Sequence, residues 1–192
     1  MEKLNALDTE IFCWINQHHC SFADYVLWTF SQPWLTALVL VAVFVFLTLR
    51  KEKKMWWLVL LGIALCFLFA DRISVLCFKD VFQRLRPCHA LPEVRMIFGM
   101  TCGGQYGFIS SHAANCFALA MFLALRYRKT WKPMPYLIFA LAIIVGYSRP
   151  YLGKHYLGDV VCGALVGVLI GLAIYFLINW LTKKLKYKNY ET

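Results

Sequence analysis

The chain is 192 residues long, and 61% of its residues are hydrophobic while 16% are charged. Four uncharged runs, at 25–49, 55–70, 133–148 and 160–182, exclude an ordinary soluble domain, because about 20 apolar residues are enough to cross a bilayer core. The formal net charge of +10 would suit a nucleic-acid-binding protein, but the positions of the charges argue against that class. We therefore expect an all-α protein, a polytopic bundle of five to six membrane helices.

Most of the positive charge falls in short clusters between the apolar runs. Twelve of the 20 lysines and arginines belong to three clusters: Arg50, Lys51, Lys53 and Lys54; Arg126, Arg128, Lys129 and Lys132; and Lys183, Lys184, Lys186 and Lys188. Basic residues collect in the loops that remain in the cytoplasm. The clusters therefore predict a membrane topology rather than a nucleic-acid partner, and they place the polar segment 88–109 on the non-cytoplasmic side.

The N-terminal region, residues 1–33, is expected to lie at the membrane interface. Within residues 3–19, apolar side chains recur at helical spacing with polar residues between them: Leu4, Leu7, Ile11, Trp14 and Ile15. This pattern predicts an amphipathic helix in the interface. Pro33 interrupts the next stretch, so we expect a short helix over 22–30 and a first full span over 34–49.

The second span begins at Met55 and is expected to end at Pro87. Its last part reads KDVFQRLRP and puts three polar residues on one helical face: Lys79, Gln83 and Arg86. On another face Asp80 could pair with Arg84, four residues later. A basic face of this kind is also found at ordinary solvated helix ends, so it needs a second basic site on the same side of the membrane to indicate a function.

Two cysteines, Cys88 and Cys102, lie in the polar loop 88–109. They differ from the cysteines of the apolar spans, which are expected to be small buried hydrophobes. A disulfide between them would close a loop of about 15 residues and contribute roughly 3 kcal/mol in the entropic model. Two free thiols are the alternative, and the sequence leaves both open.

The next helix begins with FISSHAANCF. Either Ser110 or Ser111 is expected to be its N-cap, and His112 lies in its first turn. A helix start offers free N–H groups and positive potential, which suit an anion. His112 alone could be a structural residue of the interface. Beside basic residues at an anion site, it is expected to donate a proton to a leaving oxygen.

The last two helices are expected over 133–148 and from about 155 to 181. Glycines recur at four-residue spacing in the final span, at Gly163, Gly167 and Gly171. Such a stripe predicts that another helix packs closely against this one.

Between these helices stands SRPYLGKHYLGD, residues 148–159. If the last helix starts near His155, then Asp159 lies one turn further on, within reach of the imidazole. A carboxylate there would fix the ring tautomer and stabilise the cation that forms when the histidine attacks. The guanidinium of Arg149 matches the oxygens of a phosphate, so the stretch indicates phosphoryl transfer. His-x-x-x-Asp at a helix start also occurs by chance and in metal sites. Other segments are therefore needed to show whether this stretch belongs to a phosphoryl-transfer site.

Three segments together resemble the signature motifs of the type 2 phosphatidic acid phosphatase superfamily, the integral-membrane lipid phosphatases. KDVFQRLRP matches K-x6-RP, FISSHA matches the PSGH element, and SRPYLGKHYLGD matches SR-x5-H-x3-D, in the expected order. The resemblance covers Lys79 to Asp159. The chain departs from the family at two positions, with Ile109 in place of the usual proline and Ser111 in place of glycine.

The resemblance implies one lipid phosphatase domain over residues 1–192, with the bundle at 34–182 and a cytoplasmic basic tail at 183–192. It makes His155 the nucleophile that forms a phosphohistidine, Asp159 its orienting residue and His112 the acid for the leaving group. Five residues would hold the phosphate oxygens: Lys79, Arg86, Arg149, Ser110 and Ser111 through its backbone. The family needs no metal ion or other cofactor. The residues agree, because three cations repel a metal ion and stabilise a phosphoryl transition state. A neutral His155 with a charged His112 would give a bell-shaped pH dependence.

The predicted topology brings all three motifs to the non-cytoplasmic face of the cell (inner) membrane, where a lipid phosphate would be the substrate. The overall resemblance is greatest to bacterial undecaprenyl-diphosphate phosphatases, so undecaprenyl diphosphate is the expected lipid. Alternatives of the same class are a phosphatidylglycerophosphate phosphatase, a lipid A phosphatase and a lipid phosphotransferase. Two alternatives belong to other classes. One is a small transporter, in which ionisable groups are expected at mid-membrane, and the other is a metal hydrolase that uses His112, His155 and Asp159.

Overall fold

The computed structural model describes residues 2–32, 34–35, 38, 42 and 55–188. Across these residues every regular element is a helix, and the only β contact is an isolated antiparallel bridge between Leu85 and Tyr106. The chain is therefore an all-α membrane bundle, as predicted. Most of the predicted first span, 34–49, the basic cluster at 50–54 and the tail residues 189–192 lie outside the described residues.

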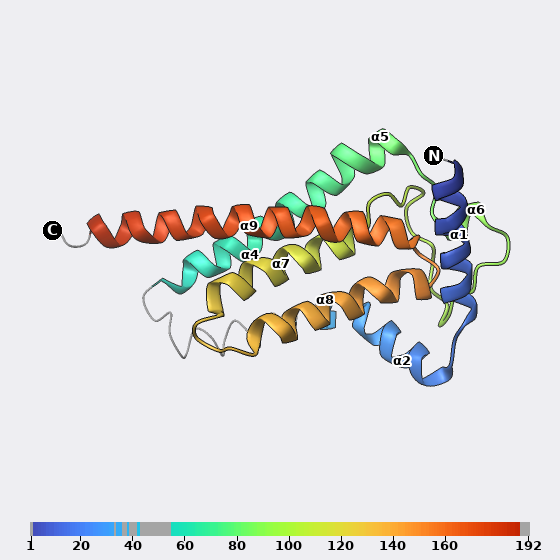
Figure 1. Cartoon of the computed structure of the whole chain (residues 1–192), viewed down its shortest axis with the longest axis horizontal. Helices are drawn as coiled ribbons and strands as arrows, with labels where there is room; N and C mark the ends of the chain where they lie inside the picture. Colours follow the sequence, from blue (N-terminus) through green and yellow to red (C-terminus); the bar gives the residue numbers. More distant parts are fainter. Residues whose placement is uncertain (1, 33, 36–37, 39–41, 43–54, 189–192) are drawn as a thin grey trace.

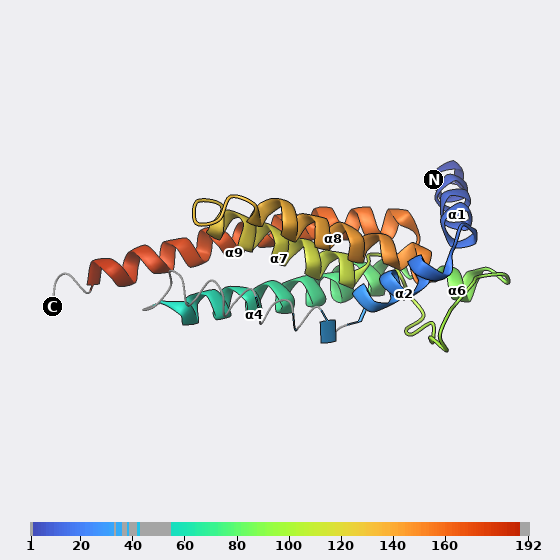
Figure 2. The same ribbon diagram turned by 90° about the horizontal axis from the view of Figure 1, so that it is seen from below.

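Four helices run along the long axis of the molecule: α4 (Trp56–Ile73), α7 (Ser111–Tyr127), α8 (Met134–Tyr151) and α9 (Leu157–Lys188) (Figures 1 and 2). Helices α7 and α9 each contact all of the other long helices, and α7 supplies many of the buried core residues. The segments Trp56–Phe82 and Leu157–Lys186 are long and apolar enough to cross a membrane. Helices α7 and α8 have 17 and 18 residues, which gives each a length of about 26 Å.

The glycine stripe of α9 packs against the backbone of α7, as predicted. A Cβ atom added at Gly163, Gly167 or Gly171 would collide with a carbonyl oxygen of Ser110, Ala114 or Ala118, respectively. Only glycine lets the two backbones approach this closely. The stripe therefore fixes the start of α7, which carries His112, against the start of α9.

The second span ends earlier than predicted. Helix α4 continues into a π-helical segment, Ser74–Lys79, and then into α5 (Asp80–Phe82). It stops there because Gln83 has a left-handed backbone, with φ of 47°. Pro87 instead opens the short helix α6 (Pro87–Ala90). The expectation that Lys79, Gln83 and Arg86 share one helical face was therefore wrong.

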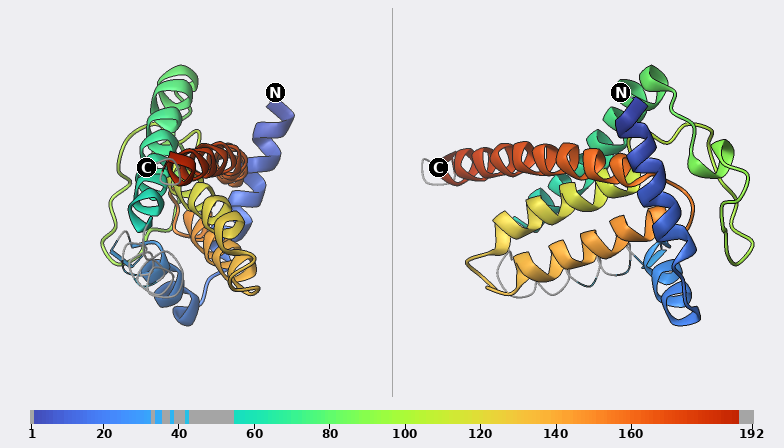
Figure 3. Two further views of the ribbon diagram at one scale, coloured as in Figure 1. Left: turned by 90° about the vertical axis from the view of Figure 1, so that its left-hand side faces the viewer. Right: turned by 45° about the vertical axis from the view of Figure 1, so that its right-hand side comes forward.

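Two N-terminal helices, α1 (Glu2–Gln17) and α2 (Ser21–Phe30), precede the bundle, as predicted. Helix α1 crosses the ends of the long helices nearly at right angles to them (Figure 3). Its apolar residues divide between two directions, since Phe12 and Ile15 are buried whereas Leu4, Leu7 and Trp14 are exposed. One side of α1 thus packs on the bundle, and the other side is free to contact a membrane surface.

Polar contacts hold the two N-terminal helices to the bundle. The Asn16 side chain donates to the backbone carbonyls of Tyr151 (2.9 Å) and Arg95 (3.1 Å). Arg95 forms a bidentate ion pair with Asp24 of α2 (3.0 and 2.5 Å), which also accepts from the Tyr151 hydroxyl. Arg95 and Tyr151 in turn hold the pKa of Asp24 below its usual range. The end of α8 and the loop 88–109 are therefore fixed to α1 and α2.

Candidate active site

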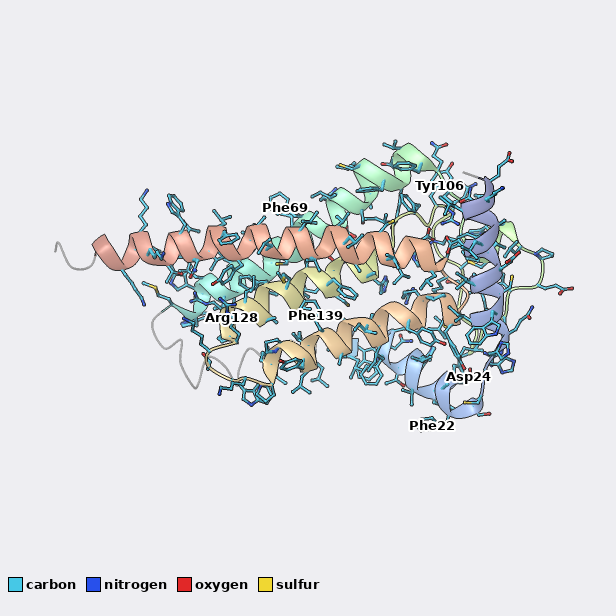
Figure 4. The ribbon with its side chains drawn as sticks, viewed as in Figure 1. Phe22, Asp24, Phe69, Tyr106, Arg128 and Phe139 are labelled. Atoms are coloured by element: carbon cyan, nitrogen blue, oxygen red, sulfur yellow. A yellow bond between two sulfur atoms is a disulfide. The ribbon has the colours of Figure 1, made fainter. Side chains whose placement is uncertain are left out.

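The predicted site residues gather at the end of the bundle that α1 crosses. Figure 4 shows Tyr106 at this end and Arg128, from the second basic cluster, at the opposite end. Five parts of the chain contribute: the π-helical segment, the turn before α6, the start of α7, the end of α8 and the start of α9. Segments far apart in sequence thus converge at one end of the helices.

The turn between α8 and α9 carries His155. Helix α8 continues through Ser148 to Tyr151, three residues past its predicted end, and α9 begins at Leu157 rather than near His155. Between them, Gly153 takes a φ of 78° that favours glycine. His155 therefore lies in a turn rather than in the first turn of the helix.

His155 and Asp159 nevertheless lie together, as predicted. The imidazole Nδ1 is 3.5 Å from Asp159 Oδ2, which also accepts the Tyr156 backbone N–H at 3.1 Å. Both residues are almost fully buried, with exposed fractions of 1% and 0%. Gly107 covers the pair so closely that a Cβ atom there would stand 3.2 Å from the carboxylate. With Nδ1 turned towards Asp159, Nε2 is left for a ligand.

Three basic side chains surround this pair. Arg149 at the end of α8 is 2% exposed, and its Nε has no hydrogen-bond partner among the described residues. Arg86 donates from Nε to the Tyr106 carbonyl (3.3 Å) and from Nη1 to the Cys102 carbonyl (3.2 Å). Lys79 donates to the Ser111 hydroxyl at 2.6 Å. None of the three pairs directly with a carboxylate in the described part of the chain, so an anion would satisfy charges that the protein leaves uncompensated.

These cations also act on the charge of His155. Burial, followed by the charges of Arg149, Arg86 and Lys79, holds the pKa of His155 well below its usual value. The imidazole is therefore neutral at pH 7, which is the form that can attack an electrophile.

His112 lies in the first turn of α7, on the same site. The charges of Arg149, His155, Lys154 and Arg86 all act on its imidazole. Arg149 and Arg86 therefore act on both histidines.

Ser110 and Ser111 lie at the start of α7, and each also makes contacts within the protein. Ser110 is the N-cap of α7 and accepts from the Ala113 N–H at 3.4 Å, but its own N–H donates to the Asp159 carbonyl (3.0 Å). Its hydroxyl proton remains as a donor. The Ser111 hydroxyl bonds Ser74 (2.7 Å) as well as Lys79. The serine in place of the family's glycine thus holds a lysine of the site.

Sequence reasoning did not foresee the contacts of three charged residues: Arg84, Asp8 and Lys154. Arg84 does not pair with Asp80 as expected; it binds Asp159 (2.8 Å) and Asp8 of α1 (2.9 Å). Lys154 lies next to His155, and burial together with Arg149 and Arg86 lowers its pKa to about 8. Its position next to His155 was the one feature of the sequence that could have identified Lys154 as a residue of the site.

The two cysteines of the loop 88–109 form a disulfide, with Cα atoms 5.9 Å apart. The bond joins Cys88, two residues after Arg86, to Cys102, whose carbonyl accepts from Arg86. The disulfide therefore fixes the backbone around one of the basic side chains of the site.

The described residues contain no group of three His, Cys, Asp or Glu side chains arranged to hold a metal ion. The side chains next to His155 and Asp159 are instead arginines and lysines. The arrangement suits an anion with several oxygens.

Comparisons with known proteins agree with this chemistry. The sequence model of the PAP2 superfamily matches residues 57–183. A lipid A 4′-phosphatase of Bacteroides thetaiotaomicron is 32% identical over 189 residues, which cover 97% of this chain and 83% of the relative. A lipid A 4′-phosphatase of Porphyromonas gingivalis is 30% identical over 91% of this chain and 74% of its own length. The crystal structure of a transmembrane PAP2-type phosphatidylglycerolphosphate phosphatase from Bacillus subtilis has a TM-score of 0.70, with 19% identity, and covers 96% of this chain and 88% of that one.

Proposed function

The chain belongs to the PAP2 superfamily of phosphatases, and from that premise we propose that it hydrolyses the phosphate of lipid A at the outer face of the cell membrane. Membership makes it a membrane lipid phosphatase, a phosphoric monoester hydrolase of a metal-independent superfamily. The single observation that carries the proposed mechanism is the buried His155–Asp159 pair beside cations that have no carboxylate partner among the described residues.

The proposed reaction has two steps. His155 Nε2 attacks phosphorus, the bond from phosphorus to the lipid oxygen breaks, and His112 gives that oxygen its proton. Water then attacks the phosphohistidine and gives a proton back to His112, the P–N bond breaks, and inorganic phosphate leaves. Lys79, Arg86 and Arg149 would stabilise the negative charge spread over the phosphoryl oxygens. Ser110 would add its hydroxyl proton, and Ser111 a backbone N–H at the start of α7.

Asp159 has two parts in this mechanism. As a carboxylate beside Nδ1, it would keep the proton on that nitrogen and the lone pair on Nε2. It would also stabilise the positive charge of the phosphoimidazole. The separation of 3.5 Å between Nδ1 and Oδ2 places the ring beside the carboxylate.

The choice of lipid rests on the relatives. Undecaprenyl diphosphate was the expectation from sequence, whereas the two relatives that align with almost the whole chain are both named lipid A 4′-phosphatase. A monoester phosphate on an acylated sugar is therefore the better candidate. Phosphatidylglycerophosphate is the second candidate, because it is named for a solved structure of the same fold.

The proposed orientation follows from the charges. The basic cluster of Arg126, Arg128, Lys129 and Lys132 follows α7 at the end of the bundle opposite the site. Such a cluster favours the cytoplasmic side, so the site would face away from the cytoplasm in a multi-pass inner-membrane protein.

The test is phosphate release by purified protein in detergent, with lipid A, undecaprenyl diphosphate and phosphatidylglycerophosphate offered one at a time. We expect the highest kcat/KM with lipid A and none above background in His155→Ala. Preference for undecaprenyl diphosphate would overturn the choice of lipid and leave the mechanism standing. Full activity in His155→Ala would overturn the mechanism whichever lipid is cleaved.

A further inference from the structure

An arginine outside the three signature positions holds Asp159 from the side away from His155. Arg84 Nη1 lies 2.8 Å from Asp159 Oδ1, and Nη2 lies 2.9 Å from Asp8 Oδ2. The guanidinium also stacks over the Tyr156 ring, 4.0 Å from its centroid. Asp8 in turn accepts the Gly158 backbone N–H at 2.8 Å through Oδ1. Both terminal nitrogens of Arg84 and both carboxylates of this chain of contacts thus have partners.

We propose that Arg84 is a positioning residue for the His155–Asp159 pair and that Asp8 of α1 holds Arg84 in place. The inference rests on the proposed roles of His155 and Asp159. It adds to them a connection from the reacting histidine to a helix at the other end of the sequence.

The division of the two Asp159 oxygens supports this role. Oδ1 is bound by Arg84, while Oδ2 faces His155 Nδ1 and accepts the Tyr156 N–H. With Oδ1 fixed by a short charge-assisted bond, the carboxylate cannot rotate away from the imidazole. An isolated carboxylate with an exposed fraction of 0% would be costly to keep ionised. Arg84 supplies the compensating charge without occupying the oxygen that His155 needs.

Asp8 makes the arrangement depend on α1. Arg84 is 22% exposed at its side chain and could point to water, but the ion pair with Asp8 and the Tyr156 ring hold it in a single orientation. Asp8 also bonds an N–H in the first turn of α9, where a carboxylate is favoured by the helix dipole. A helix that lies across the end of the bundle thus clamps both the arginine and the start of α9.

The role can be distinguished from simple stability by its effect on pH dependence. A proton is easier to place on the His155–Asp159 pair once the positive charge of Arg84 is gone, so the acid limb of kcat/KM should move to higher pH. The other charged and titratable groups that act on the pair come from each element packed around it: Asp8 (α1), Lys79 (π-helical segment), Arg86, His112 (α7), Arg149 (α8), Lys154 and Tyr156. All of these groups are unchanged in the Arg84 variants described below, and only Asp8 is replaced in Asp8→Asn.

The experiment measures kcat, KM, the pH profile and the thermal midpoint of the full-length protein with whichever lipid it hydrolyses. Arg84→Met should lower kcat about 10- to 100-fold, the equivalent of one lost charge-assisted hydrogen bond, and move the acid limb up by about one pH unit. Arg84→Lys should restore part of kcat and most of the acid limb. Asp8→Asn should give a smaller loss of kcat, because Arg84 still reaches Asp159.

Arg95→Met is the matched control. Arg95 makes a bidentate ion pair with Asp24 of the same kind, which also holds an N-terminal helix to the rest of the protein, but it touches neither His155 nor Asp159. This variant should lose thermal stability and keep the wild-type acid limb.

An Arg84→Met protein that is less stable but has the wild-type pH profile would overturn the proposal. If Arg84→Met does not fold, a wild-type kcat in both Arg84→Lys and Asp8→Asn would do the same. These outcomes differ from failure of the proposed mechanism, which would show as activity in His155→Ala.

Discussion

The disulfide between Cys88 and Cys102 should stabilise the protein and keep Arg86 in position for phosphate. The sequence separation of 14 gives a closed loop of about 15 residues, for which the chain-entropy model assigns about 3 kcal/mol. In a chain of this size, 1 kcal/mol shifts the thermal midpoint by about 2–4 °C. The double variant Cys88→Ser with Cys102→Ser should therefore melt about 6–12 °C lower.

The same change should raise KM more than it lowers kcat. The two acceptors of the Arg86 guanidinium are the carbonyls of Cys102 and Tyr106, and the Arg86 N–H itself donates to the Gln105 carbonyl. Loss of the bond lets the segment that carries these acceptors move. Arg86 is proposed to bind the phosphate oxygens, whereas the attack is made by His155, so binding is affected first.

The assay combines thermal unfolding in detergent with phosphate release as a function of lipid concentration. Dithiothreitol should reproduce the effect in the wild type and change nothing further in the double variant. Cys20→Ser, at an exposed free cysteine, is the control and should behave like the wild type. A double variant whose midpoint and KM both equal those of the wild type would show that the loop is held without the disulfide.

Two further predictions concern the helix contact and the basic site. Gly167→Ala should destabilise the protein by about 1–3 kcal/mol in a thermal unfolding experiment, because its Cβ would collide with the Ala114 carbonyl. Gly104→Ala is the control and should be neutral, because no atom lies within 4 Å of the added Cβ. Lys154 lies next to His155, and we predict that its ammonium helps to bind the phosphate. Its pKa is about 8, so the ammonium is present below that pH and is lost above it, and KM of the wild type should rise from pH 7 to pH 9. Lys154→Met should have a higher KM at pH 7 and no such rise, and an unchanged alkaline rise in that variant would contradict the role.

Local patterns were enough to predict much of the site. The glycine stripe of α9 is a four-residue repeat, and close packing against α7 follows from repeat geometry alone. The cap at Ser110 follows from the preference of serine for helix starts. The proximity of His155 and Asp159 also followed from short spacing, although the turn at Gly153 delays the helix by two residues.

The contacts of Arg84 were beyond the reach of the sequence. The predicted pair with Asp80 assumed that the helix continues to Pro87, but Gln83 ends it in a left-handed conformation that glutamine seldom adopts. Arg84 therefore lies outside the helix and not one helical turn after Asp80. Its actual partners, Asp8 and Asp159, lie 76 residues before it and 75 residues after it in the chain, so only the tertiary fold brings the three together.

The basic residues of the site are proposed to act on His155, the proposed nucleophile, as well as on the phosphate. Without substrate, Arg149, Arg86 and Lys79 disfavour a positive charge on His155 and keep its imidazole unprotonated. A bound phosphate dianion cancels much of that positive potential. A positively charged phosphoimidazole then becomes tolerable at the moment when it forms, with Asp159 on the far side of the ring to stabilise it. Replacing one of these cations with a neutral side chain should therefore weaken phosphate binding and also raise the pKa of His155. A single variant should thus lose both affinity for phosphate and part of the unprotonated His155.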